Sequence, residues 1–336
     1  MKIMKMTGLK RRIAGIILMI ISTAWLAGCS AKTADPVSRS SFLLNTFVTV
    51  TLYDSQDEEI LDGCIELCSE YEKRLSKTLE ESEIYRLNHR KPGERTFTVS
   101  EPAARVLEKG LEYSRISDGA FDITIEPLSS LWNFTGEDPQ IPSEEEIGEL
   151  VKRVDYRKVS LEGTQVTFAD DVTTIDLGAI AKGFIADELK AYLKEQGVKS
   201  AIINLGGNVL AIGGKPDGSS FNIGIQEPFH ADGEPITSVY LKDQSVVTSG
   251  TYQRYFEKDG ILYHHILNPS TGSPCNNGLS SVTIITDSSL TADALSTTCF
   301  LLGPEEGMKL VNQLDNVDAI FISTDNEITY SRNFLK

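Results

Sequence analysis

The stretch 263–272, Tyr-His-His-Ile-Leu-Asn-Pro-Ser-Thr-Gly, is followed later in the chain by 291–297, Thr-Ala-Asp-Ala-Leu-Ser-Thr. Between them, residues 279–286 form a β-rich run bounded by Asn-Asn-Gly and Asp-Ser-Ser, which predicts a strand. The predicted order is a loop, a strand and then a helix from about Ser289. The two motifs therefore flank a single strand.

The predicted helix carries two oxygen-bearing side chains, Asp293 and Thr297, four residues apart and hence on one face. Oxygen ligands near a helix N-terminus suit Mg²⁺ beside a phosphate, since the free N–H groups there also favour an anion. The same spacing allows a structural interpretation, in which Asp293 caps the helix and Thr297 packs in the core.

A second candidate unit is 176–183, Asp-Leu-Gly-Ala-Ile-Ala-Lys-Gly. It lies where a predicted strand, Thr173–Leu177, meets a predicted helix, Ala179–Gln196. Gly178 allows a tight turn, and Lys182 follows one turn into the helix, which suits a diphosphate. An ordinary packed strand–helix turn explains the same residues. The spacing matches neither a Walker A loop nor a dinucleotide-binding glycine pattern.

The N-terminus has the pattern of a lipoprotein signal. Basic residues precede a short apolar run, 13–26, and the sequence then ends in Leu-Ala-Gly-Cys. We expect a signal peptide over 1–28, a lipidated Cys29 that begins a flexible tether over 29–40, and one domain over 41–336. An uncleaved membrane anchor is the alternative, although the run is short for a spanning helix. Both place the protein at the cell membrane, facing the extracytoplasmic side.

The composition, 40% hydrophobic and 24% charged, is that of a soluble globular protein. Without residues 1–28, 27 basic residues face 48 acidic ones, which argues against nucleic acid as a partner. Cys64 and Cys68 lie four apart with no second pair or histidine, so we expect them on a buried helix face and expect no zinc.

The remaining pattern predicts an α+β fold. Phe42–Tyr53 is rich in Val, Thr and aromatic residues and predicts a strand, and Asp57–Leu75 predicts an amphipathic helix. Helices and strands are interspersed along the chain, but hairpins outnumber βαβ units, which favours α+β layers over a doubly wound sheet.

The histidine pair His264 and His265 lies at the end of a predicted strand, so the two side chains should face opposite ways. One of them could face a site while the other faces the core or solvent. A single histidine is more often structural than catalytic. Hydrolase triad and zinc-protease motifs lack support in the sequence.

Taken together, these units resemble the FAD:protein FMN transferase (ApbE) family over Phe42 to Phe321. The resemblance rests on six ordered motifs behind the lipoprotein signal: Gly119–Asp122 with Pro127-Leu128 and Leu131-Trp132, Asp176–Gly183, Ile203–Asn208, Val247–Gly250, His265–Gly272 and Ala292–Thr297. It implies an α+β fold of mixed or antiparallel sheets with peripheral helices, and FAD bound in a central cleft.

The resemblance implies Mg²⁺-dependent transfer of FMN from FAD to a Ser or Thr hydroxyl of a partner protein, with release of AMP. The implied metal ligands are the Ala179 carbonyl, Asp293 and Thr297. The implied acceptor is an extracytoplasmic flavoprotein domain of a membrane redox complex. We expect His265 to act as the base on the acceptor hydroxyl. The implied FAD contacts are Ala120, Phe121, Asp122, Asp176, Lys182, His265 and Leu267.

Three positions depart from the family pattern. Asn268 stands where an Asp is usual and can still cap its turn, Ile123 replaces a frequent Pro, and Thr78 lies where many relatives carry an aromatic residue that packs on the flavin. Two other functions remain open from sequence: a Mg²⁺-dependent FAD pyrophosphatase giving FMN and AMP, and a lipid-anchored flavin-binding protein without enzymatic activity.

Overall fold

The fold is organised around one large antiparallel sheet. The computed structural model describes residues 35–136, 139–230 and 233–334. In spatial order the sheet contains β1 (Val37–Leu43), β2 (Thr46–Leu52), β6 (Ala201–Leu205), β7 (Asn208–Ile212), β10 (Ser245–Gly250), β13 (Leu279–Thr286), β14 (Asp318–Ser323) and β15 (Ile328–Tyr330). Every neighbouring pair in it is antiparallel.

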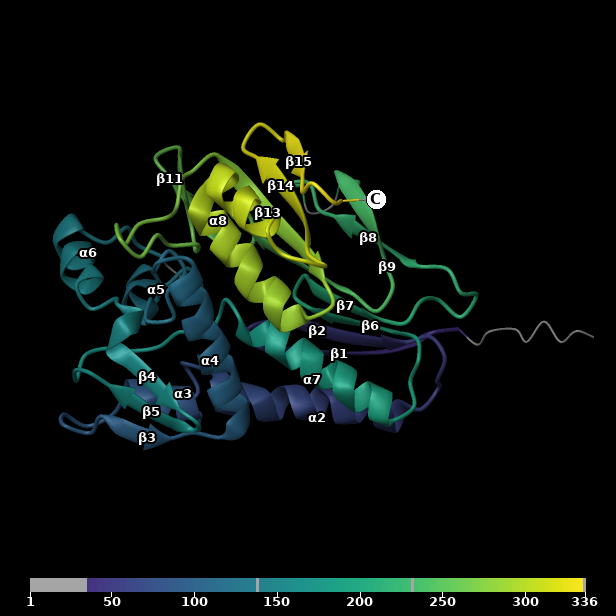
Figure 1. The fold of residues 1–336 in the computed structure, drawn as a ribbon, viewed down its shortest axis with the longest axis horizontal. Coiled ribbons are helices and arrows are strands. Elements are labelled where there is room, and N and C mark those ends of the chain that lie inside the picture. Colours follow the sequence, from purple (N-terminus) through teal and green to yellow (C-terminus); the bar gives the residue numbers. More distant parts are fainter. Residues whose placement is uncertain (1–34, 137–138, 231–232, 335–336) are drawn as a thin grey trace, which may run out of the picture. The chain divides into compact units, whose positions relative to one another are not determined.

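Three helices cover one face of this sheet: α2 (Glu58–Leu75), α7 (Ala181–Glu195) and α8 (Ser289–Val311). Figure 1 shows them lying across the strands. The hairpin of β8 (Phe221–Ile225) and β9 (Thr237–Leu241) packs on the opposite face through a separate apolar cluster. The result is a three-layer arrangement with the sheet in the middle.

Strand β13 shows why the sheet is buried on both sides. All eight of its residues are buried, with Ile284 in the helix-side core and Ile285 in the hairpin-side cluster. Successive side chains of a strand point to opposite faces, so a strand covered on both faces needs a nearly continuous run of apolar and small residues. The predicted strand over 279–286 is confirmed.

Helix α8 consists of two helical halves separated by a break. Gly303 has φ 83° and ψ 178°, and Pro304 follows it. Proline lacks an N–H and clashes with the preceding turn, so it starts the second half without continuing the first. The helix predicted from about Ser289 corresponds to the first of these halves.

The remaining elements form two smaller groups beside the sheet. The strands β3 (Thr96–Thr98), β5 (Gln165–Phe168) and β4 (Val159–Glu162) make a three-stranded sheet near α3 (Glu83–Asn88), α4 (Glu101–Ile116) and the 3-10 turn Tyr156–Lys158. A third apolar cluster joins α5 (Glu126–Trp132) and α6 (Glu144–Val151) to the hairpin of β11 (Tyr255–Lys258) and β12 (Ile261–His264).

Two predicted segments differ in the structure. The predicted single strand Phe42–Tyr53 is a hairpin of β1 and β2, turning at Leu44 and Asn45, both with positive φ. Only Asn45 is a usual residue for such a turn, so the sequence signal was weak. Strand β1 begins at Val37, so the predicted tether over 29–40 overlaps it at residues 37–40.

The predicted strand Thr173–Leu177 is wrong, because this segment is extended but joins no sheet. The backbone N–H and carbonyl of Ile175 form hydrogen bonds with a side chain instead of with a neighbouring strand. The Ile175 N–H donates to Asn88 Oδ1 at 2.7 Å, and Asn88 Nδ2 donates back to the Ile175 carbonyl at 2.8 Å. One asparagine side chain therefore replaces a strand partner.

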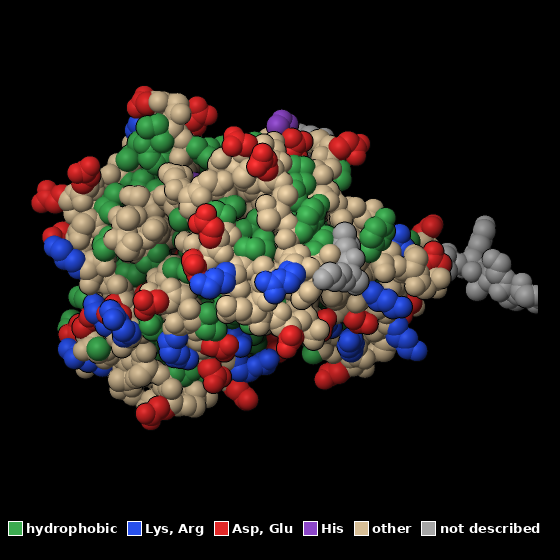
Figure 2. Space-filling view, turned by 45° about the horizontal axis from the view of Figure 1, so that its top comes forward, with side chains coloured by type: hydrophobic (Ala, Val, Ile, Leu, Met, Phe, Trp, Pro, Cys, Tyr) green, Lys and Arg blue, Asp and Glu red, His purple; other side chains and the backbone are tan. Residues whose placement is uncertain are grey.

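The predicted signal peptide and Cys29 lie outside the described residues. Within the described part of the chain, no helix is long and apolar enough to cross a membrane. Cys64 and Cys68 are buried in α2, as expected, and burial raises the pKa of both thiols to about 12. On the face in Figure 2, the described acidic and basic side chains are interspersed.

Candidate active site at the start of helix α7

The turn before α7 holds a carboxylate in a fixed position. Asp176 Oδ2 lies 3.0 Å from Lys77 Nζ and accepts a hydrogen bond from Ser129 Oγ at 2.7 Å. The Gly178 N–H donates to Asp176 Oδ1 at 2.8 Å. Burial alone would raise the pKa of Asp176, but Lys77, Ser129 and Gly178 outweigh it and hold the pKa below its usual value. Asp176 is therefore an anion whose charge Lys77 balances.

The first turn of α7 packs directly against Asp293 of α8. The Gly183 N–H donates to Asp293 Oδ2 at 2.8 Å. A Cβ on Gly183 would lie 2.3 Å from the Ser289 carbonyl oxygen and 2.7 Å from Asp293 Cβ, so only glycine fits this contact. The 176–183 motif thus meets the 291–297 motif in space, with Ala179 in the turn that precedes α7.

The face of α8 that carries Asp293 also carries Thr297, which shares a hydrogen bond of 2.9 Å with Ser249 Oγ of β10. Asp293 does not cap α8, because the N-cap is Ser288, whose side chain accepts from the Thr291 N–H. The structural interpretation of Asp293 as a cap is therefore wrong. Its carboxylate is 3% exposed and faces α7 at Gly183.

The oxygen atoms of Asp293 and Thr297 are the kind of donor that binds a hard cation. Asp293 uses only Oδ2 in its hydrogen bond to Gly183, and a hydroxyl shared between Thr297 and Ser249 retains lone pairs for a ligand. In the described residues no three His, Cys, Asp or Glu side chains form a cluster that could hold a metal. A set of one carboxylate, one hydroxyl and one carbonyl would not form such a cluster.

The two neighbouring histidines differ in burial and in contacts. His264 is 1% exposed and packs edge-on against Phe300, while His265 is half-buried. The Arg254 carbonyl lies 3.1 Å from the His265 backbone N and 3.2 Å from its Nδ1. This contact fixes the ring and assigns the proton to Nδ1, which leaves Nε2 as the acceptor nitrogen.

His265 is a neutral imidazole in an electropositive setting. Burial lowers its pKa, and the charges of Arg254 and Lys182 act in the same direction, giving a value of about 3. The influence of both cations places Arg254 and Lys182 within electrostatic reach of the ring. Two sequence motifs, 176–183 and 265–272, therefore converge on one location.

The Gly-Ala-Phe-Asp unit, residues 119–122, adjoins the 176–183 motif and is held by its own hydrogen bonds. Asp122 accepts hydrogen bonds from the Thr124 N–H, the Thr124 hydroxyl and the Tyr156 N–H, at 2.6–2.9 Å. Phe121 is buried in the core, and the carbonyl of Ile123 accepts from the Asp176 N–H at 2.8 Å. The side chains of Phe121 and Asp122 are committed to the fold, so their predicted contact with FAD would fall to the backbone around Ala120.

The Asn-Pro-Ser-Thr-Gly turn is held by its own side chain. Asn268 Oδ1 accepts from the Ser270 N–H at 2.9 Å and from the Ser270 hydroxyl at 2.7 Å, so Asn268 caps the turn as predicted. Trp132 Nε1 donates to the Gly272 carbonyl at 2.8 Å. The Leu267 side chain is buried in the third apolar cluster, which leaves its backbone for any contact with a ligand.

Sequence reasoning missed two cations at the site, Lys77 and Arg254. Lys77 precedes Thr78, which is exposed, and its ammonium contacts Asp176 and the Ser129 hydroxyl, at 3.0 and 2.6 Å. Neither residue lies in a motif with a known spacing. Their roles depend on contacts between segments far apart in the chain, which no periodicity reveals.

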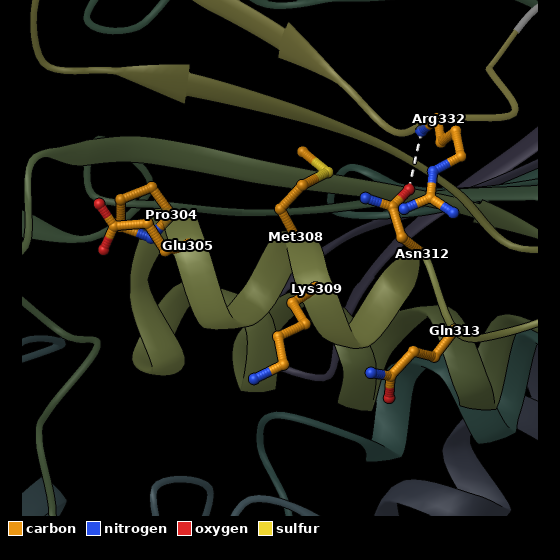
Figure 3. A pocket seen from close by; sticks show the side chains of 7 residues that line it. All are labelled: Pro304, Glu305, Met308, Lys309, Asn312, Gln313 and Arg332. Carbon is orange, nitrogen blue, oxygen red and sulfur yellow. Dashed lines mark hydrogen bonds between the residues drawn. The ribbon is translucent and has the colours of Figure 1, made fainter.

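A hollow lies elsewhere, along the second half of α8. It has a volume of about 490 Å³ and is lined by Pro304, Glu305, Met308, Lys309, Asn312, Gln313 and Arg332. Figure 3 shows these side chains spread along the helix, with Asn312 bonded to the Arg332 backbone N–H at 2.7 Å. None of the predicted site residues lines this hollow.

The fold and site define an α+β protein that gathers cations, a neutral imidazole and a helix start around one point. The ApbE family profile matches residues 44–321, and the chain belongs to this family. The predicted family and fold class are both confirmed.

Similar proteins cover nearly the whole chain. A protein of Klebsiella pneumoniae (strain 342) named FAD:protein FMN transferase is 37% identical over 296 residues, spanning 88% of this chain and 91% of that protein. One of the same name from Treponema pallidum (strain Nichols) is 32% identical, spanning 94% and 92%. The crystal structure of the ApbE protein of Thermotoga maritima superposes with a TM-score of 0.80 at 33% identity, covering 89% and 98%.

Proposed function

We propose that this protein transfers FMN from FAD to a Ser or Thr hydroxyl of an acceptor protein and releases AMP. The observation that carries the proposal is the contact of the 176–183 motif with Asp293 of α8, where the Gly183 N–H donates to Asp293 Oδ2 at 2.8 Å, with His265 in electrostatic reach of Lys182. A family relative named for the same reaction, 37% identical, supports it.

The start of α7 suits the diphosphate of FAD. Lys182 is the second residue of α7, and its ammonium makes one long contact, 3.5 Å, to the Gly178 carbonyl. The positive end of the helix dipole and the nearby ammonium both favour phosphate oxygens, while the Ala181 and Gly183 N–H groups themselves donate to the Leu177 carbonyl and to Asp293. FAD in this position would extend from the α7 start toward His265 and the hairpin of β11 and β12.

His265 would accept the proton of the acceptor hydroxyl through Nε2. Its pKa of about 3 keeps the ring neutral at pH 7, as a base requires, but makes it a weak base on its own. A bound diphosphate adds negative charge near the ring, which raises the pKa toward neutrality. The base would therefore become effective only with its substrate in place.

Magnesium would be held by Asp293, Thr297 and the carbonyl of Ala179. The ion would supply a Lewis acid that offsets the negative charge of the diphosphate. Asp293 keeps its orientation through the Gly183 N–H, and Thr297 through Ser249. A protein with net charge −16 needs such local positive charge to admit a doubly negative substrate.

The proposal extends to location and partner. Lipidation of Cys29, after removal of 1–28, would anchor the protein to the extracytoplasmic face of the cell membrane. The acceptor would then be an extracytoplasmic flavoprotein domain, such as one belonging to a membrane redox complex. Palmitate labelling of the full-length protein, compared with Cys29→Ala, tests the anchor.

The activity test incubates the full-length protein with FAD, Mg²⁺ and a candidate acceptor domain, following acceptor mass and nucleotide products together. We expect the acceptor to gain one FMN with an equal amount of AMP, and EDTA to stop both. Free FMN and AMP with an unmodified acceptor across several candidate domains would instead support the pyrophosphatase. Tight FAD binding without turnover would support a flavin-binding protein.

A further inference from the structure

The guanidinium of Arg254 is a half-buried charge without a partner. Among residues 35–136, 139–230 and 233–334, none places a carboxylate within 4 Å of it or accepts a hydrogen bond from it. Only the Arg254 carbonyl is engaged, by His265. Burying a charge without a counter-charge is costly, so such a group is retained where a ligand supplies the counter-charge.

The charges around Arg254 do not balance within the protein. Asp176 acts electrostatically on Arg254 but is already paired with Lys77 at 3.0 Å. Lys182 also has no carboxylate partner in the described part of the chain and contacts only the Gly178 carbonyl. Arg254 and Lys182 therefore contribute two uncompensated positive charges. A diphosphate diester carries two negative charges.

We propose that Arg254 is a catalytic residue that binds the phosphate transferred to the acceptor, the FMN phosphate of FAD. This inference rests on the proposed function. The Arg254 carbonyl holds the His265 ring at 3.2 Å, and the Arg254 charge acts on that ring, which supports the choice of phosphate because the base must lie beside the phosphorus that the hydroxyl attacks. Lys182, at the start of α7, would hold the other, adenosine-side phosphate.

The step itself balances as follows. The acceptor oxygen forms a bond to the FMN phosphorus while His265 Nε2 takes the hydroxyl proton. The bond from that phosphorus to the bridging oxygen breaks, and the bridging oxygen leaves on AMP. The two non-bridging oxygens on the transferred phosphorus share one negative charge before and after transfer, and a guanidinium fork binds such a pair of oxygens bidentately.

The test compares Arg254→Met and Arg254→Lys with Arg332→Met, which removes an arginine from the distant hollow on α8. Binding of FAD, FMN, AMP and riboflavin is measured by flavin fluorescence or calorimetry. We expect Arg254→Met to weaken FAD and FMN about 10- to 100-fold while leaving riboflavin and AMP within about twofold. Transfer to the acceptor should fall about 100- to 1,000-fold. Arg332→Met should match the parent protein.

A stability measurement separates this role from a structural one. Arg254→Met should melt at the same or a higher temperature than the parent without ligand, because it removes an uncompensated charge. Its stabilisation by FAD should be smaller. A lower melting temperature with unchanged FAD and FMN affinity would overturn the proposal, as would a loss of affinity for AMP but not FMN. If Arg254→Met does not fold, Arg254→Lys, which keeps the charge but loses the fork, should bind FMN less tightly.

The two proposals fail differently. Were the parent protein to flavinylate no acceptor, the proposed function would fail, while the FMN and AMP binding measurements would still decide the role of Arg254. Normal transfer by Arg254→Met would leave the function intact and remove Arg254 from it.

Discussion

Two arginines, Arg254 beside the α7 start and Arg332 beside the hollow on α8, show what distinguishes a site from a cavity. Burial lowers the pKa of Arg254, against the opposing effect of Asp176. Arg332 is exposed, so water solvates its charge at no cost. The other cation of the hollow, Lys309, is already paired with Glu306 at 2.9 Å.

The difference teaches that volume alone does not identify a reactive site in this protein. The α7 start combines charges without partners, a neutral imidazole and a carboxylate aligned by a backbone N–H. The hollow combines an ion pair, a solvated arginine and polar side chains at the surface (Figure 3). Substitutions at the α7 start should therefore change chemistry, and substitutions in the hollow should change little.

The largest effect should come from the base. His265→Gln removes proton acceptance at Nε2, so transfer should fall about 100- to 10,000-fold. FAD affinity should change only a few-fold, because Lys182 and the helix start remain. Acceptor mass against time, with FAD titrations in parallel, measures both. Full flavinylation by His265→Gln would remove this residue from the reaction.

Asp293→Asn should have the next largest effect. The amide oxygen can still accept from the Gly183 N–H, so the fold should persist, but the negative charge that attracts a cation is lost. At about 1 mM Mg²⁺ we expect the transfer rate to fall about 100-fold or more. The rate should recover partly at higher Mg²⁺ concentrations. A variant with unchanged Mg²⁺ dependence would contradict the ligand assignment.

Asp122 and Asp176 test the distinction between a residue that holds the fold and a residue that binds the substrate. Asp122 is buried and takes three hydrogen bonds, so Asp122→Ala should lower the free energy of unfolding by about 3 kcal/mol. Asp176→Asn should lower stability less and FAD affinity more, because the resemblance implies that this carboxylate contacts FAD. Urea unfolding and FAD titration of both variants provide the measurements, and the reverse order would refute the distinction.

Acid should destabilise the protein partly through His264. Burial lowers its pKa to about 4, against the opposing effect of Asn276 and Cys275, while an unfolded histidine titrates near 6.5. Below pH 6.5 the unfolded state binds the proton first, so stability is lost as pH falls toward 4. The loss at pH 5 should be about 2 kcal/mol. His264→Gln should flatten the profile between pH 7 and 5, and an unchanged slope would count against this origin.

The smallest effect should follow changes in the hollow. Lys309→Gln breaks an exposed ion pair with Glu306, which contributes about 0.5 kcal/mol or less. Transfer rate and FAD affinity should stay within about twofold of the parent. A strong loss of FAD binding in this variant would show that the hollow, and not the α7 start, holds the substrate.

Much of the fold could be predicted from local patterns. The strand over 279–286 and the helix ending at Leu75 follow from composition and periodicity. The segment 173–177 could not, because its strand-like pattern is completed by the Asn88 side chain, which lies far away in sequence. The turn at Leu44 was missed since leucine rarely adopts a positive φ.

Some residues of the candidate site could likewise be predicted from the sequence, and others could not. The motif residues Asp176, Lys182 and His265 were identified by resemblance, and in the structure Lys182 lies within electrostatic reach of His265. Lys77 and Arg254 were not, because their significance lies in which charges have partners. Pairing is a property of tertiary contacts and leaves no pattern along the chain.

The most direct measurement is a structure of the full-length protein with FAD and Mg²⁺, in the His265→Gln variant to prevent turnover. The account predicts the diphosphate at the start of α7, with one phosphate on Lys182 Nζ and the FMN phosphate on the Arg254 guanidinium, each at about 3 Å. FAD in the hollow on α8, or a diphosphate that touches neither cation, would contradict it.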